Sequence, residues 1–177
     1  MPNGTGAQNA PDPLGKNVEV YFWSSDIGEK SVGHVLLKEA NSAKVLLSQF
    51  PHEGANPLDA WGLNRTLSLP ETVSRERGPP DMVFQVTIHN VAAFNATVKD
   101  HAERTWWSPL PISSDATHCA RAVAAALQAG GVYVSREYPF NYEPNEILPG
   151  TLANVLARES SQPHSGVKKI MSLNRQE

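Results

Sequence analysis

Residues 117–131 read THCARAVAAALQAGG, and this stretch gives the clearest structural signal in the chain. Its many alanines favour a helix over 117–129. An apolar stripe runs along that helix at helical spacing: Ala120, Val123, Ala124 and Leu127. The glycine pair at 130–131 predicts where the helix ends. We therefore expect an amphipathic helix that packs one face against a core.

Cys119, the only cysteine of the chain, falls at the start of this helix. A disulfide within the chain and a metal site with two thiolates are thereby excluded. A thiol in the first helical turn faces unpaired backbone N–H groups and the positive end of the helix dipole, which favour the nucleophilic thiolate. The same N–H groups could bind the oxyanion of a tetrahedral intermediate. The alternative is that Cys119 is a small buried apolar residue.

The rest of the chain predicts an α+β fold. Strands are expected over 17–24, 31–39, 44–50 and 82–88, and further helices over 90–104 and within 145–159, with a start after Pro149 as one option. The two runs at 31–39 and 44–50 flank a short Asn-Ser turn and predict an antiparallel hairpin. Residues 51–81 are rich in proline and glycine and predict a long loop.

His34 starts the apolar part of the first hairpin strand and follows Gly33. A histidine on a strand is rigidly placed, as a general base for a thiol should be, although a structural role is the alternative. A turn of three residues would place Ser48 opposite His34, and a turn of two or four would place Gln49 there. Either side chain could orient the imidazole as the third member of a triad.

His118 adjoins Cys119, but neighbouring helical side chains point about 100° apart. We expect His118 to line or cap the site rather than act as the base. Together with Thr117 and Gln49 it forms the predicted substrate and oxyanion region. The histidines at 52, 89, 101 and 164 show no spacing typical of a zinc site, so no metal and no cofactor are expected.

Three short motifs resemble the circularly permuted branch of the NlpC/P60 superfamily of papain-like cysteine hydrolases: GHV at 33–35, LSQFP at 47–51 and HCARAV at 118–123. In that branch the histidine strand precedes the cysteine helix, as here. The chain departs from the pattern at His118, where many members have asparagine, and at Ser48, where members place histidine, asparagine or another polar residue.

The resemblance implies a papain-like fold, with a small antiparallel sheet carrying His34 and Ser48 against the Cys119 helix. It implies a cysteine hydrolase of the amidase or peptidase type that forms an acyl-enzyme on a peptide, amide or acyl substrate. A lipid-directed acyltransferase or esterase of the same fold, and a non-catalytic binding module that keeps the fold, remain open as alternatives.

The chain has 177 residues, with 15 basic and 18 acidic side chains and a formal charge of −3. This charge argues against a nucleic-acid partner, and no apolar run approaches the roughly 20 residues of a membrane span. We expect a flexible leader at 1–16, one catalytic domain at 17–158 and a loose polar tail at 159–177.

The leader lacks the pattern of a secretory signal. The expected location is therefore the cytoplasm, or export as an effector or toxin through a dedicated secretion system. An exported toxin would require an inhibitor (immunity) protein as its partner in the producing cell.

Overall fold

The computed structural model describes residues 15–24, 33–51, 62–108, 116–134 and 148–172. Most of the predicted leader lies outside these ranges. The fold is mixed α and β, with four helices and an antiparallel sheet of five strands among the described residues. No helix in this part of the chain is long and apolar enough to cross a membrane.

The five-stranded sheet has the order β3-β2-β1-β6-β9 and is antiparallel throughout. Its strands are β1 (Lys16–Trp23), β2 (His34–Glu39), β3 (Val45–Leu47), β6 (Met82–Ile88) and β9 (Val167–Ser172). β1 alternates, with Val18, Val20 and Phe22 buried, whereas β2 is buried at every position from His34 to Lys38. A strand that is buried on both faces lies inside the molecule. His34, the first residue of β2, is therefore buried as well.

A smaller four-stranded sheet has the order β4-β5-β7-β8. Its strands are β4 (Gln49–Pro51), β5 (Gly62–Thr66), β7 (Trp106–Trp107) and β8 (Ala116–Thr117). Ser48 is the single residue between β3 and β4, so it joins the two sheets. β8 leads through His118 directly into the cysteine helix.

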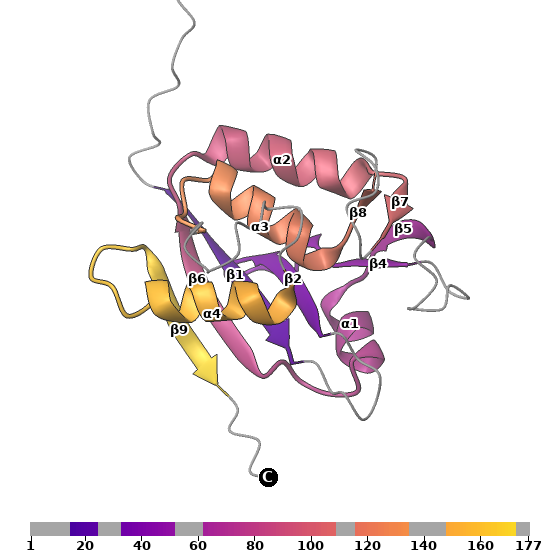
Figure 1. Cartoon of the computed structure of the whole chain (residues 1–177), viewed down its shortest axis with the longest axis horizontal. Coiled ribbons are helices and arrows are strands. Elements are labelled where there is room, and N and C mark those ends of the chain that lie inside the picture. Colours follow the sequence, from indigo (N-terminus) through magenta and orange to yellow (C-terminus); the bar gives the residue numbers. More distant parts are fainter. Residues whose placement is uncertain (1–14, 25–32, 52–61, 109–115, 135–147, 173–177) are drawn as a thin grey trace, which may run out of the picture.

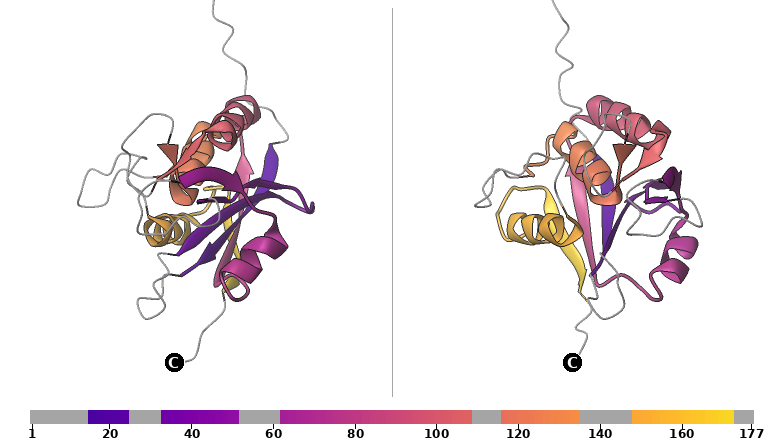
Figure 2. Two further views of the ribbon diagram at one scale, coloured as in Figure 1. Left: turned by 90° about the vertical axis from the view of Figure 1, so that its right-hand side faces the viewer. Right: turned by 45° about the vertical axis from the view of Figure 1, so that its right-hand side comes forward.

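The helices are α1 (Leu69–Arg75), α2 (Val91–Glu103), α3 (Cys119–Ala129) and α4 (Pro149–Glu159). α3 packs against β2, with α2 and α4 as its neighbours, whereas α1 lies apart from the other three helices (Figures 1 and 2). α3 is buried on nearly all sides, which its alanines permit because they let neighbouring elements approach closely. The core therefore surrounds the helix that carries Cys119.

The chain differs from the sequence-based expectation in four places. The predicted loop at 51–81 contains β5 and α1, and the predicted polar tail contains β9, which pairs with β6 along the sheet edge. The strand expected over 44–50 is broken at Ser48. The cysteine helix begins at Cys119 rather than at residue 117, because Thr117 belongs to β8.

Candidate active site

His34 is held at the start of β2 between aromatic rings. Gly33, directly before it, has φ 78°, a left-handed conformation that favours glycine. The imidazole stacks on Phe50, with 3.9 Å between the ring centroids and 16° between the planes. The centroid of the Trp23 ring lies 5.9 Å from that of the imidazole. With the residue only 2 % exposed, this packing fixes the position of the ring.

The structure brings His34 and Ser48 together. The His34 Nε2 atom lies 3.0 Å from the Ser48 hydroxyl oxygen, and that oxygen lies 2.9 Å from the Thr72 hydroxyl oxygen. The hydroxyl of Thr72 in turn donates to the Ser68 carbonyl at 2.8 Å. Because this series of hydrogen bonds occupies Nε2 of His34, a proton exchanged with a thiol would pass through Nδ1 of His34.

The hairpin register differs from both sequence-based alternatives. Leu37 pairs with Leu47, but the register shifts between Leu37 and Lys38, which pairs with Val45. Continuing the first pairing towards His34 leads to Phe50, whose ring indeed stacks on the imidazole. Ser48 still reaches the ring because it sits where β3 ends and β4 begins.

Cys119 is the first residue of α3 and lies beside the strand of His34. The backbone N–H of Val35, the residue after His34, acts on the sulfur and favours its thiolate form, as do the N–H groups of Cys119 and Ala120 at the helix start. The next two N–H groups of the helix are used elsewhere, since Arg121 donates to Nδ1 of His118 and Ala122 to the His118 carbonyl. His118 is thus the N-cap of α3.

Burial outweighs these N–H groups and makes both side chains, Cys119 and His34, neutral. The loss of water around Cys119 raises the pKa of its thiol to about 11, the opposite of the shift expected from the helix start alone. Burial, with a smaller contribution from the positive charge of Arg75, also lowers the pKa of His34 to about 3. At neutral pH the site therefore holds a thiol and an uncharged imidazole, without an ion pair.

α1 supplies charged groups around this pair. The guanidinium of Arg75 lies over the Phe50 ring at 4.7 Å, on a ring that itself stacks on His34. Glu76, the C-cap residue of α1, raises the pKa of the Cys119 thiol through its negative charge. Burial raises the pKa of Glu76 itself, while Arg75 opposes that shift.

Gln49 and Thr117 lie away from the imidazole. The side-chain amide of Gln49 donates to the His101 carbonyl at 3.5 Å and accepts from the Thr66 hydroxyl at 3.2 Å. The Thr117 hydroxyl lies 2.9 Å from Nδ1 of the buried His101. These hydrogen bonds join β4, β5, β8 and α2, so both side chains support the frame around the site rather than contact His34 or Cys119.

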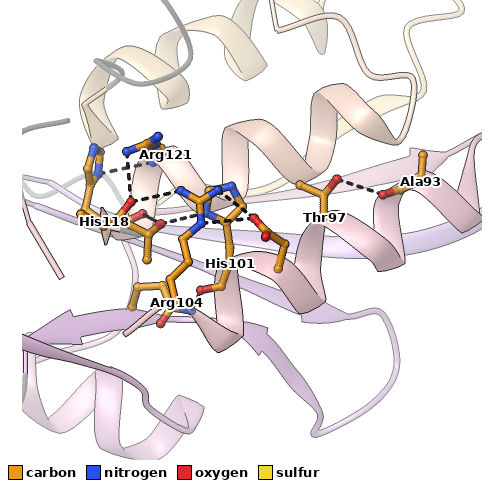
Figure 3. Close-up of polar contacts among 10 residues, drawn as sticks. Ala93, Thr97, His101, Arg104, His118 and Arg121 are labelled. Atoms are coloured by element: carbon orange, nitrogen blue, oxygen red, sulfur yellow. Dashed lines mark hydrogen bonds and ion pairs between the residues drawn. The ribbon is translucent and has the colours of Figure 1, made fainter. Parts of the chain in front are cut away.

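A cluster of polar side chains holds in place the backbone segment that leads into α3 (Figure 3). The guanidinium groups of Arg104 and Arg121 both donate to the Ala116 carbonyl, at 3.1 and 3.0 Å. Asp100 binds Arg104 through two hydrogen bonds, at 2.7 and 3.2 Å. Two arginines on one carbonyl hold β8 in place, and β8 ends one residue before His118.

Sequence reasoning missed Thr72, Arg75 and Phe50. A signal for α1 was present, because Ser68 and Glu71 have the spacing of a capping box and Pro70 suits a first helical turn. The structure shows both capping hydrogen bonds. Recognising this helix inside the predicted loop would have placed Thr72 and Arg75 on one ordered element.

No group of three or more His, Cys, Asp or Glu side chains that could hold a metal ion occurs within the described ranges. No family model, no curated protein and no solved structure matches this chain. The chemistry of the site therefore carries the functional argument.

Proposed function

We propose that the chain is a papain-like cysteine hydrolase that forms an acyl-enzyme on Cys119. One observation carries the proposal: the sulfur lies at the first residue of α3, beside the Val35 N–H, and the adjacent residue His34 is held through Nε2 by Ser48. A nucleophile, a base and a group that orients the base thus come from three separate parts of the sequence.

In the proposed reaction, Cys119 attacks the carbonyl carbon of an amide or ester while its proton passes to Nδ1 of His34. The N–H groups of Cys119 and Ala120 stabilise the oxyanion. The protonated His34 then gives its proton to the leaving group, and water releases the acyl group from the sulfur with His34 again as base. Because the thiol and the imidazole are both neutral at pH 7, the proton would leave the sulfur during the attack rather than before it.

A non-catalytic module that keeps this arrangement is the second candidate. Cys119 is only 6 % exposed, belongs to the hydrophobic core and has a raised thiol pKa, all of which suit a structural cysteine. On this hypothesis the His34–Ser48–Thr72 chain serves only to satisfy buried polar groups.

Mass spectrometry of the folded protein separates the two candidates. The full chain is incubated at pH 7 with p-nitrophenyl esters of short and long acyl chains, and the modified residue is located by peptide mapping. We expect one acyl group on Cys119 and none at that position in Cys119→Ala. His34→Gln should acylate about 10²–10⁴-fold more slowly, the usual contribution of a general base.

The matched control is His89→Gln, which changes an exposed histidine outside the site and should leave the acylation rate unchanged. Acylation of Cys119 only after unfolding, or at the same rate in His34→Gln, would contradict the hydrolase proposal and favour the non-catalytic module.

A further inference from the structure

We propose that Thr72 is a positioning residue that, through Ser48, holds His34 in the tautomer with its proton on Nε2. The structural part of this inference stands on hydrogen-bond geometry alone. Its catalytic consequence rests on the proposed function.

Ser68 lies at the far end of this series of hydrogen bonds. The Thr72 hydroxyl oxygen lies 2.8 Å from the Ser68 carbonyl oxygen. A carbonyl can only accept, so the single hydroxyl proton of Thr72 points to Ser68. The Thr72 oxygen is then left as an acceptor towards its other neighbour.

That neighbour is Ser48, whose hydroxyl oxygen lies 2.9 Å from the Thr72 oxygen. Since Thr72 has no further proton to give, Ser48 must donate to it. The Ser48 oxygen then faces His34 Nε2, 3.0 Å away, with lone pairs only. The proton of this last hydrogen bond must therefore belong to Nε2 of His34.

The direction of these hydrogen bonds is fixed because the two hydroxyl groups have no access to water. Ser48 and Thr72 are both 0 % exposed. The Ser68 carbonyl also accepts from the Thr72 N–H at 2.9 Å, and the capping box with Glu71 holds Ser68 in place. The N–H of Leu67 donates to the Ser48 carbonyl at 3.1 Å, which ties the residue before this cap to Ser48.

The consequence for chemistry is a bare lone pair on Nδ1, the nitrogen that would receive the thiol proton in the proposed reaction. If Ser48 donated to Nε2 instead, the proton of the neutral ring would lie on Nδ1. Nδ1 could then not accept the thiol proton. A neutral imidazole has one protonated and one bare nitrogen, and burial keeps His34 neutral over a wide pH range, so the choice of tautomer decides whether it can act as a base.

Long-range ¹H–¹⁵N NMR of the uniformly labelled full chain at pH 7 tests the inference, since protonated and bare ring nitrogens differ strongly in shift. The His34 signals are assigned by their loss in His34→Gln. We expect the wild-type proton on Nε2. Thr72→Ser keeps the donor and should keep this tautomer.

Thr72→Val removes the hydroxyl at nearly constant shape. The Ser48 hydroxyl is then free to donate to Nε2, and we expect the Nδ1–H tautomer to become populated. Acylation of Cys119 at pH 7 should fall by about tenfold or more in Thr72→Val and recover in Thr72→Ser.

A wild-type proton on Nδ1 would overturn the inference, whether or not Thr72→Val folds, and so would an unchanged tautomer in folded Thr72→Val. A wild-type Nε2 proton that Thr72→Val shifts, in a protein whose Cys119 never acylates, would support the inference while contradicting the proposed function.

Discussion

At His34 and Cys119, burial decides the protonation state. The helix start and three N–H groups favour a thiolate, but the loss of hydration around the sulfur is the larger effect, and the pKa of the thiol rises to about 11. The sequence predicted the position of Cys119 on the helix but not its depth in the core. It could therefore not show which of the two opposing effects on the pKa is stronger.

Ser48 was one of two residues that the sequence offered as the partner of His34, and the structure places it within hydrogen-bonding distance. Phe50 was recognised only as part of the motif at 47–51 and not as a contact of His34. Its stacking on the imidazole follows from a register shift between Leu37 and Lys38, which no local sequence pattern marks.

Replacing Arg75 by glutamine should raise the pKa of His34. The positive charge of Arg75 lowers this pKa, and the substitution removes the charge from the ring that stacks on the imidazole. NMR titration of the His34 ring measures the change, with the exposed Lys99→Gln as the charge-matched control. An equal His34 pKa in wild type and Arg75→Gln would show that Arg75 does not act on the site.

Acid should destabilise the fold through His34 and His101, whose folded pKa values lie at about 3 and 4, below the model-compound value of 6.5. Below pH 6.5 the unfolded chain binds protons at these positions that the folded chain does not. The free energy of unfolding should therefore fall as pH drops from about 6.5 to 4, by up to about 1.4 kcal/mol per pH unit for each histidine.

Chemical denaturation across this pH range measures the slope. It should be shallower in His101→Gln and in His34→Gln than in wild type. Equal slopes in all three proteins would mean that the two buried histidines take up protons as readily in the folded state as in the unfolded state.

At the scale of elements, α1 connects the site to the rest of the fold. It provides Thr72, Arg75 and Glu76, yet it lies within a region whose prolines and glycines predicted a loop. Strongly periodic elements, such as β1, β6, α2 and α3, were predicted within a few residues. β9 was missed because its exposed lysines at 168 and 169 and its mostly exposed face resemble a polar tail.

Ser68→Ala should destabilise the protein by about 1 kcal/mol, because it removes the side-chain half of the capping box of α1. It should also increase the mobility of Thr72, which donates to the Ser68 carbonyl. Equilibrium unfolding measures the loss, and Ser74→Ala, in an exposed position of the same helix, is the control. A loss no larger than that of the control would show that α1 does not depend on its cap.

Gly130→Ala should destabilise the end of α3 by about 1–3 kcal/mol. Gly130 has φ −72°, so its backbone tolerates alanine, but an added Cβ would lie 2.9 Å from Cγ2 of the buried Ile88. The Gly130 carbonyl also accepts from the N–H groups of His89 and Asn90, so the displacement would reach the start of α2.

Gly150→Ala is the matched comparison, since nothing lies within 4 Å of the added Cβ in the first turn of α4. It should stabilise the protein by about 0.5 kcal/mol. Thermal unfolding of both variants measures the difference. Equal effects in the two variants would contradict the close packing of α3 on β6.

At the scale of the whole molecule, the structure is mixed α and β, with a five-stranded antiparallel sheet and four helices among the described residues. The α+β class was predicted from periodicity and turn residues. The joining of two sheets at Ser48 was not, because it depends on strand pairings between residues far apart in the sequence. The functional proposal accordingly rests on the packing of α3 against β2 and on the contacts of α1 with Ser48 and Phe50.

The pH dependence of Cys119 acylation by a neutral activated ester tests this account most directly. With a His34 pKa of about 3 and a thiol pKa of about 11, wild type should show a rate plateau between these values. In His34→Gln only the thiolate can react, so the rate should rise about tenfold per pH unit up to the thiol pKa. A wild-type rate that rises with the same slope as His34→Gln would contradict the account.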